Sequence, residues 1–250
     1  MKIATFVKEI KKANTITLLT GAGISTASGI PDFRGENGFW KSNTPIYFDE
    51  FLASAEKRLE SWKNNIALTK KLKSITFNKG HILVKQILEL NPKNMLITQN
   101  IDGLHEKSGV PQNNIIEIHG TALKASCLRC EKFFGLDKFH KAFIAKNPIP
   151  NCDVCNGLIK VATISFGQPM NPLTMEKALV TTLESNLMIV LGSSLVVQPV
   201  ADLPRIALEN GSKLVICNLQ PTPYDSCATL VINEDIENIA EEVLLNHELG

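Results

Sequence analysis

The sequence predicts an α/β fold: a doubly wound parallel sheet with helices on both faces and one small module inserted. Three observations lead to this fold class. Short apolar runs alternate along the chain with stretches of helical periodicity. Several of those runs end at Gly, Gln, Asn or His, which places polar groups at the edge where open α/β sheets bind ligands. Finally, residues 121–160 hold four cysteines and no long hydrophobic period, which is typical of a small inserted module.

The alternation predicts the order of the elements. We expect strands at 16–19, 94–98, 115–118, 187–191 and 213–217. We expect helices at 2–13, 48–72, 81–90, 173–183 and 238–245, the third of them capped by Asn78. Residues 1–120 and 161–250 then form the sheet domain and 121–160 the module, with part of 36–80 joining the module in a small domain.

The composition limits the class of protein. The chain has 250 residues, of which 44% are hydrophobic, enough for a sizeable core. Its formal net charge is +1, without a long block of one sign, which argues against nucleic acid or a membrane as the main partner. The first residues lack the apolar core of a signal peptide, and no apolar run reaches the roughly 18 residues of a membrane span. We therefore expect a protein of the cytoplasm.

A glycine-rich turn follows the first predicted strand. Gly21 and Gly23 come directly after the run at 16–19, as in the Rossmann-like turns that bind dinucleotide phosphates through backbone N–H groups. Thr26 occupies the place of the usual third glycine. Pro31 would cost a helix about 3 kcal/mol, so no long helix follows the glycines. The loop turns early and carries a carboxylate, an aromatic ring and a guanidinium, from Asp32, Phe33 and Arg34.

The four cysteines form two C-x-x-C pairs. Cys127 and Cys130 are separated by 21 residues from Cys152 and Cys155. Four thiolates at this spacing suit tetrahedral Zn²⁺, and a full set of protein ligands makes the metal structural. The alternative is a pair of disulfides, which needs an oxidising compartment. Zinc would supply folding energy that so short an insertion cannot obtain from its own core.

Polar residues follow two other strands. His119 ends the apolar run at 115–118 and precedes a glycine, so its ring can face an open crevice as a general base. The alternative is a structural histidine. Gln99, Asn100 and Asp102 follow the run at 94–98 and offer amide and carboxylate groups to a ribose or a carboxamide. For Asp102 the alternative is capping of a turn.

Together these motifs resemble the sirtuin family, in the family's order and over nearly the whole chain. The matching segments are Gly-Ala-Gly-Ile-Ser at 21–25, Gly-Ile-Pro-Asp-Phe-Arg at 29–34, Thr-Gln-Asn-Ile-Asp at 98–102, His119-Gly120, the four cysteines, Gly-Ser-Ser-Leu at 192–195 and Asn218-Leu219. The segment 45–62 is similar to the mitochondrial and bacterial branch of the family.

The resemblance implies that the chain binds NAD and consumes it as a co-substrate. The NAD-binding residues that it implies are Gly21, Ala22, Gly23, Thr26, Asp32, Phe33, Arg34, Gln99, Asn100, Ile101, Asp102, His119, Gly192, Ser193, Ser194, Asn218, Gln220 and Asp235. Within this set the glycines approach the pyrophosphate, residues 100–102 line the nicotinamide pocket, and Asp235 lies near the adenine.

The implied reaction is the removal of an acyl group from lysine in a protein or peptide. The acyl oxygen displaces nicotinamide from the ribose, and His119 then acts as base on a ribose hydroxyl, with Asn100 and Asp102 as the other catalytic residues. The products are nicotinamide, O-acyl-ADP-ribose and free lysine. Two alternatives remain: ADP-ribosyl transfer or NAD hydrolysis on the same fold, and a non-catalytic NAD-sensing interaction module. His119 and Asn100 argue against the last, because a pure binder needs no base.

The chain departs from the family pattern at two places. Gln168 follows Phe166-Gly167 where the family commonly has Glu, so we expect a weaker preference for basic residues in the substrate peptide. Desuccinylase-type sirtuins have a tyrosine three residues before an arginine in the helical segment. Here Ala55 precedes Arg58 at that spacing, so we expect discrimination against acidic acyl groups.

Overall fold

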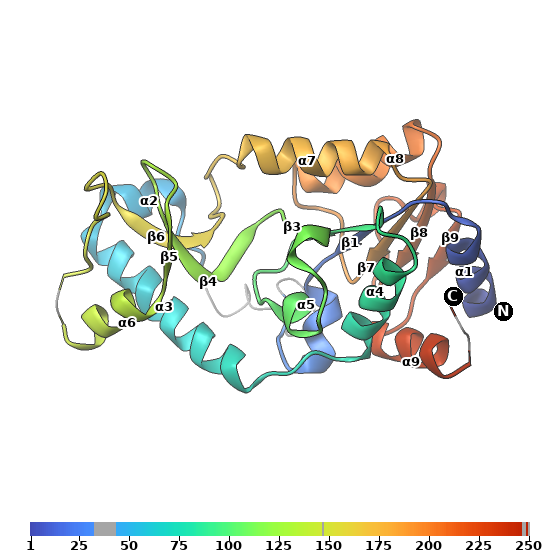
Figure 1. Cartoon of the computed structure of the whole chain (residues 1–250), viewed down its shortest axis with the longest axis horizontal. Coiled ribbons are helices and arrows are strands. Elements are labelled where there is room, and N and C mark those ends of the chain that lie inside the picture. Colours follow the sequence, from blue (N-terminus) through green and yellow to red (C-terminus); the bar gives the residue numbers. More distant parts are fainter. Residues whose placement is uncertain (33–43, 147, 247–248, 250) are drawn as a thin grey trace.

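The computed structural model describes residues 1–32, 44–146, 148–246 and 249. Figure 1 shows two layered parts along the long axis, a large sheet covered by helices and a smaller sheet with its own helices. Among the described helices, none is long and apolar enough to cross a membrane.

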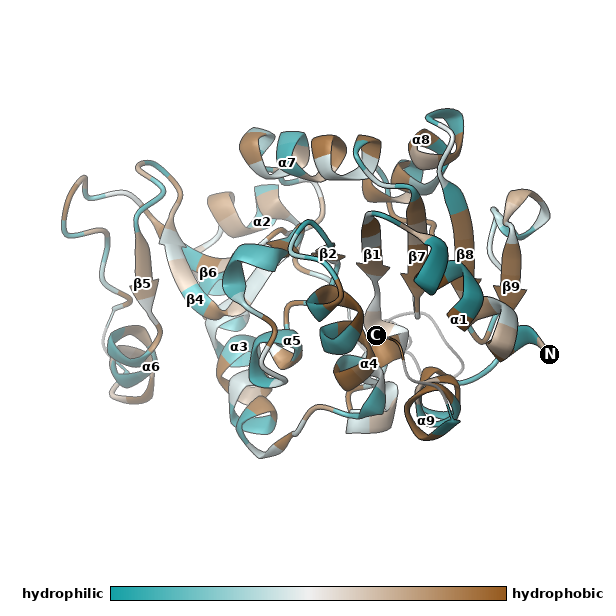
Figure 2. Ribbon diagram, turned by 45° about the vertical axis from the view of Figure 1, so that its right-hand side comes forward, coloured by the Kyte–Doolittle hydropathy of each residue, from teal (hydrophilic) through white to brown (hydrophobic). Residues whose placement is uncertain are grey.

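The large sheet is parallel throughout and has the strand order β3-β2-β1-β7-β8-β9. Its strands are β1 (Ile16–Thr20), β2 (Met95–Thr98), β3 (Ile115–Glu117), β7 (Leu187–Leu191), β8 (Lys213–Cys217) and β9 (Leu230–Ile232). All residues of β1 and β7 are buried, and Figure 2 shows β7 and β8 as largely hydrophobic ribbons. The chain order reverses between β1 and β7, the kind of switch point at which such sheets bind ligands.

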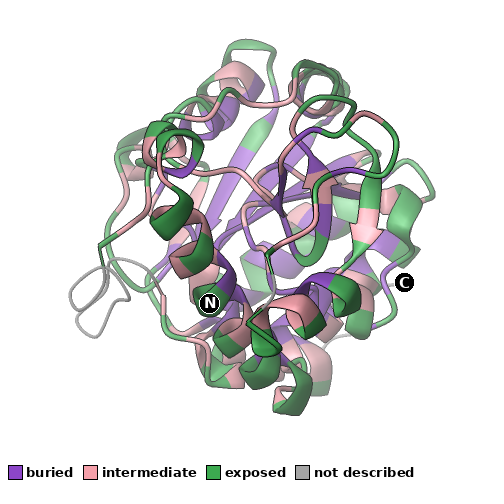
Figure 3. Ribbon diagram, turned by 90° about the vertical axis from the view of Figure 1, so that its left-hand side faces the viewer, coloured by how far each residue is buried: buried purple, intermediate pink, exposed green. Residues whose placement is uncertain are grey.

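Helices cover both faces of this sheet. The helices α1 (Lys2–Lys12), α4 (Lys79–Glu89) and α9 (Ile236–Asn246) supply one buried apolar cluster. The helices α7 (Pro172–Leu183) and α8 (Leu203–Glu209) supply the other. Figure 3 shows the buried strands inside and the exposed outer faces of the helices. The predicted doubly wound sheet is therefore confirmed.

One predicted helix is wrong in its extent. Instead of a single helix over 48–72, the structure has α2 (Phe48–Ala53) and α3 (Ala55–Ser74). Ser54 separates them with an extended backbone, φ −117° and ψ 122°. Its hydroxyl oxygen accepts a hydrogen bond from the N–H of Lys57 at 3.2 Å, so this serine caps a new helix within the apolar pattern.

The smaller sheet is antiparallel, with the order β5-β4-β6. Its strands are β4 (Gly120–Cys127), β5 (Phe133–Gly135) and β6 (Ile159–Thr163), accompanied by α6 (Asp137–Ile144). Trp62 of α3 stacks on Phe139 of α6 with ring centroids 5.2 Å apart, so α3 packs against the predicted module. The domain boundaries at 121 and 160 remain predictions.

Candidate active site

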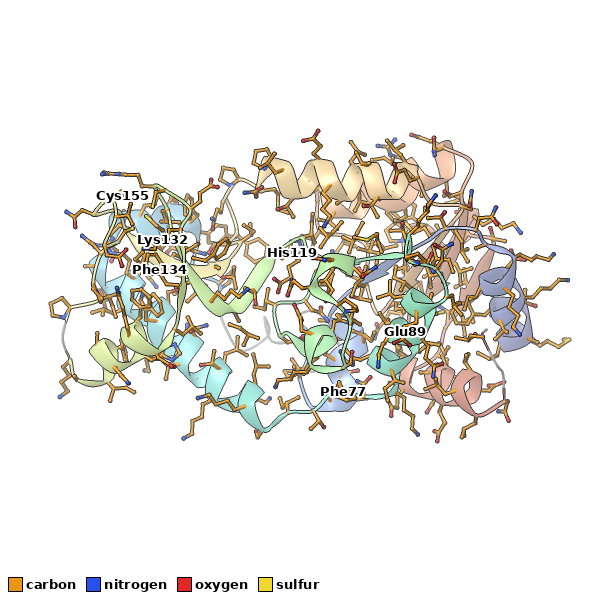
Figure 4. The ribbon with its side chains drawn as sticks, viewed as in Figure 1. Phe77, Glu89, His119, Lys132, Phe134 and Cys155 are labelled. Carbon is orange, nitrogen blue, oxygen red and sulfur yellow. The ribbon has the colours of Figure 1, made fainter. Side chains whose placement is uncertain are left out.

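A cavity of about 600 Å³ lies at the carboxyl ends of the parallel strands, beside the end of β6. Residues from the loops after β1, β2, β7 and β8 line it, and so do His119 and residues 163–168. Its volume is within the range of small-molecule sites in proteins. Figure 4 places His119 at the junction of the two sheets.

Three glycines bring the loops after β1 and β7 into backbone contact. A Cβ on Gly21 would lie 2.7 Å from the carbonyl oxygen of Gly192, and one on Gly23 would lie 2.8 Å from the Cα of Gly192. The N–H of Gly23 donates to that same carbonyl oxygen at 2.9 Å. The following helix is a short 3-10 segment, Ala22–Ser28, ended by Gly29 at φ 88°, as the sequence predicts. A side chain at either glycine would force the two loops apart.

Hydrogen bonds fix the orientation of Asn100 on the cavity wall. Its Nδ2 donates to the carbonyl oxygen of Gly21 and to the hydroxyl of Ser25, each at 3.2 Å. Both amide hydrogens are therefore used, and the atom that Asn100 can offer to a ligand is the acceptor Oδ1. Sequence reasoning gave no role to Ser25, although it belongs to the motif at 21–25.

Asp102 lies behind this wall instead of on it. It is 7% exposed and is absent from the described residues that line the cavity. Its two oxygens accept hydrogen bonds from the hydroxyl of Ser25 at 2.8 Å and from the N–H of Leu104 at 2.9 Å. Burial raises the pKa of this carboxyl, while the two hydrogen bonds act in the opposite direction. Asp102 thus caps a turn and also holds Asn100 through Ser25.

His119 has one defined tautomer. Its Nδ1 lies 3.1 Å from the carbonyl oxygen of Gln99, which can only accept, so Nδ1 carries the proton and Nε2 the lone pair. The side-chain oxygen of Gln99 accepts a hydrogen bond from the hydroxyl of Ser193 at 2.6 Å. Gln99 therefore links the histidine to the loop after β7. In the neutral ring, a proton on Nδ1 and a lone pair on Nε2 make the tautomer in which His119 can act as a general base at Nε2.

A second pocket of about 40 Å³ adjoins the first. It gathers several of the predicted residues, Thr26, Asp32, Asn218, Gln220 and Asp235. Glu234, which sequence reasoning missed, lines it as well. The predicted residues Ala22, Ile101, Gly192, Ser193 and Ser194 line the main cavity, whereas Phe33 and Arg34 lie outside the described residues.

The four cysteine sulfurs all lie within 4.8 Å of one another. The Sγ atoms of Cys127 and Cys155 are 3.4 Å apart, and those of Cys130 and Cys152 are 3.6 Å apart. A tetrahedral Zn²⁺ with bonds of about 2.3 Å places its sulfurs about 3.8 Å apart, so the donor set fits zinc. These distances are too long for disulfides, and none of the six cysteines is in one.

Comparison with known proteins decides the family. The model of the Sir2 family matches residues 21–199. This chain belongs to the Sir2 family. The chain is similar to the NAD-dependent protein deacetylase of Rhodopseudomonas palustris, with 41% identity over 91% of this chain and 90% of the relative. It is also similar to the NAD-dependent protein deacetylase of Thermotoga maritima, with 39% identity over 98% of each chain. The sirtuin resemblance is thus confirmed.

Solved Sir2 structures share the fold. One described as Sir2 with a p53 peptide and NAD+ has a TM-score of 0.85 and 37% identity, covering 98% of both chains. Another, described as Sir2 bound to acetylated peptide, has a TM-score of 0.83 and 36% identity, also covering 98% of both. The parallel sheet, which the sequence predicts, and the separate small antiparallel sheet with its cysteine cluster, which the structure adds, together make the sirtuin fold.

Proposed function

We propose that this Sir2-family chain is an NAD-dependent protein-lysine deacylase. One observation carries the proposal: His119 stands on the cavity wall with its proton held on Nδ1 by the carbonyl of Gln99. A pure NAD-binding module would need no such base. The names of the relatives, NAD-dependent protein deacetylase, support the same activity.

The cavity suits a dinucleotide co-substrate. NAD would supply a ribose C1′ from which nicotinamide leaves as the acyl oxygen attacks. Asn100 would orient the nicotinamide end through its Oδ1, since both of its amide hydrogens are already bound. Asn218 and Asp235, at the second pocket, would bind the adenosine end. His119 would accept the proton of a ribose hydroxyl at Nε2, which is worth roughly two to four orders of magnitude in rate.

The acyl-lysine peptide would lie along the end of β6. Thr163, the last residue of β6, and the next two residues, Ile164 and Ser165, line the cavity, where an extended peptide can add to the sheet edge. The N–H of Phe48 donates to the carbonyl of Phe166 at 2.9 Å, so α2 closes one side of this edge. Solved Sir2 structures with bound peptides support this substrate class.

Zinc would be bound by Cys127, Cys130, Cys152 and Cys155 and would act as a structural ion. Figure 4 shows Cys155 far from His119, which supports a role outside the reaction. A reducing compartment such as the cytoplasm fits this proposal, because thiolates there escape oxidation to disulfides.

The products distinguish the candidate reactions. The chain is incubated with NAD and an acetylated peptide, and the products are identified by mass spectrometry. We expect nicotinamide, deacetylated peptide and O-acetyl-ADP-ribose in equal amounts. ADP-ribosylated protein would indicate a transferase, and ADP-ribose released without peptide would indicate an NAD hydrolase. Either result in place of O-acetyl-ADP-ribose contradicts the proposal.

A further inference from the structure

Lys160, the second residue of β6, is a buried cation close to the proposed peptide edge, and the proposed reaction gives it no role. It is 2% exposed, and none of the ion pairs among the described residues includes it. Burial lowers the pKa of its amine to about 8, so the group still carries its proton near pH 7. A buried cation without a carboxylate partner is costly, so stability alone does not explain this lysine.

The ammonium of Lys160 binds the backbone of its own strand. Its Nζ donates to the carbonyl oxygen of Thr163 at 2.5 Å and to that of Val161 at 3.3 Å. The same Nζ lies 5.9 Å from the centroid of the Phe51 ring, within the range of a cation–π contact. Phe51 is a buried residue of α2, the helix that closes one side of the peptide edge. Lys160 therefore contacts both the end of β6 and α2.

The two carbonyls that Lys160 binds face away from the rest of the small sheet. The N–H of Ile164, directly after β6, donates to the carbonyl of His119 at 2.9 Å, so it points to the side of β4. Backbone polar groups of successive residues in an antiparallel strand point to opposite sides, so those of Val161 and Thr163 face the other edge. Because β6 is the last strand of its sheet, no described strand supplies donors there, and Lys160 does.

We infer that Lys160 is a positioning residue for the acyl-lysine peptide, because it holds the outward carbonyls of β6 and so fixes Thr163–Ser165 as the edge that the peptide joins. The inference rests on the proposed function, since the peptide is the ligand that this edge would bind. Residues 163–165 line the cavity, whereas Lys160 does not. Without its ammonium, the edge would have to become ordered as the peptide binds, which lowers the affinity for the peptide.

The test compares two ligands of the same cavity. Lys160→Met keeps an apolar stem but removes the charge and every N–H donor of the side chain. Calorimetry gives the Kd of the variant for an acetyl-lysine peptide and for ADP-ribose, with the melting temperature as a check on folding. We expect the variant to bind the peptide roughly three- to tenfold more weakly, the worth of one hydrogen bond, and ADP-ribose within about twofold of the wild type. Lys160→Arg, which keeps the charge and the donors, should restore most of the peptide affinity.

The matched control is Thr69→Val, which removes a buried hydroxyl of α3 that donates to carbonyls of its own helix. It should change neither affinity. Equal losses for the two ligands in Lys160→Met, or an unchanged peptide affinity, would overturn the positioning role. If Lys160→Met does not fold, Lys160→Gln, which has an amide donor but no charge, takes its place, and the same difference between the two ligands is expected.

Binding by the wild-type chain separates this inference from the proposed function. If the wild type binds the acetylated peptide no more tightly than the unacetylated one, the deacylase proposal fails and the inference fails with it. If the wild type prefers the acetylated peptide and the folded Lys160→Met variant binds that peptide equally well, the inference alone fails.

Discussion

Single backbone carbonyls decide which atoms of the candidate site face a ligand. The carbonyl of Gln99 holds the proton of His119 on Nδ1, and the carbonyl of Gly21 takes one amide hydrogen of Asn100. The sequence could predict the residue types, because they follow strands and match a motif. It could not predict that Asp102 acts through Ser25, since that contact joins residues 77 apart in the chain.

Glu117 should make stability depend on pH. Burial, aided by the nearby carboxylate of Glu106, raises its pKa from 4.5 to about 7. The folded chain therefore binds this proton more tightly than the unfolded chain does. The resulting stabilisation is present below about pH 4.5 and is lost as the pH rises through about 7. We expect Glu117→Gln to raise the melting temperature at pH 8 and to change it little at pH 4.

The control for this prediction is Glu176→Gln, which changes an exposed glutamate of α7. It should show no comparable difference between the two pH values. An equal shift for Glu117→Gln at pH 4 and pH 8 would show that its carboxyl does not titrate between those values in the folded protein.

Acidic acyl groups should be poor substrates. No lysine or arginine is among the described residues that line the cavity, whereas the carboxylate of Asp32 is. The guanidinium of Arg58 donates hydrogen bonds to the carbonyl oxygens of Phe51 and Leu52 at 3.1 and 2.9 Å. Arg58 therefore caps carbonyl groups at the C-terminal end of α2. A buried succinyl carboxylate without a cation would lose hydration worth several kcal/mol. We expect kcat/KM to be lower by roughly tenfold or more for succinyl-lysine than for acetyl-lysine in one peptide.

A neutral butyryl peptide, similar in length to the succinyl one, controls for size. If the succinyl peptide is turned over as well as the acetyl and butyryl peptides, a cation must serve the pocket and this specificity argument fails.

At the scale of elements, the length of the uninterrupted apolar run determines how well the sequence predicts a strand. The strands β7 and β8 have the predicted bounds to the residue, because β7 is an unbroken apolar run and β8 is apolar and buried after its first residue, Lys213. The edge strand β9 was missed because its apolar run, Leu230–Ile232, is only three residues long. The prediction of a single helix over 48–72 was wrong because the side chain of Ser54 caps the start of a second helix, α3. The apolar pattern does not reveal this cap.

The two cysteine pairs come together in one candidate zinc site. The N–H groups of Arg129 and Val154 each donate at 3.4 Å to the first sulfur of their pair, Cys127 and Cys152. Backbone donors of this kind stabilise thiolates beside a cation. We expect Cys127→Ala to lose zinc and to lower the melting temperature by roughly 5 °C or more, because three thiolates make a poor structural site.

Metal content by mass spectrometry and a thermal melt on the same sample check this prediction. The control is Cys227→Ala, which changes an exposed cysteine outside the cluster and should keep both zinc and stability. Full zinc occupancy with a normal melt in the Cys127→Ala variant would disprove the assignment.

At the scale of the whole molecule, the candidate site lies where the small antiparallel sheet meets the carboxyl ends of the strands of the large parallel sheet. The strand order places β1 and β7 side by side, and the glycines after them allow their loops to touch. The sequence predicted the parallel sheet, and about half of the described residues that line the cavity are among the predicted NAD-binding residues. It could not predict the small antiparallel sheet, whose strands β4 and β6 lie more than thirty residues apart and pair only in the folded chain.

The central claim, that His119 is the base of a deacylase, is tested most directly by one measurement on His119→Ala. Deacylation and nicotinamide exchange are followed on the same sample, with the melting temperature as a check on folding. We expect deacylation to fall by roughly two to four orders of magnitude, while nicotinamide exchange is less affected because nicotinamide departs before the base is needed. The melting temperature should stay near that of the wild type. A destabilised variant with near-normal deacylation per folded molecule would contradict the account.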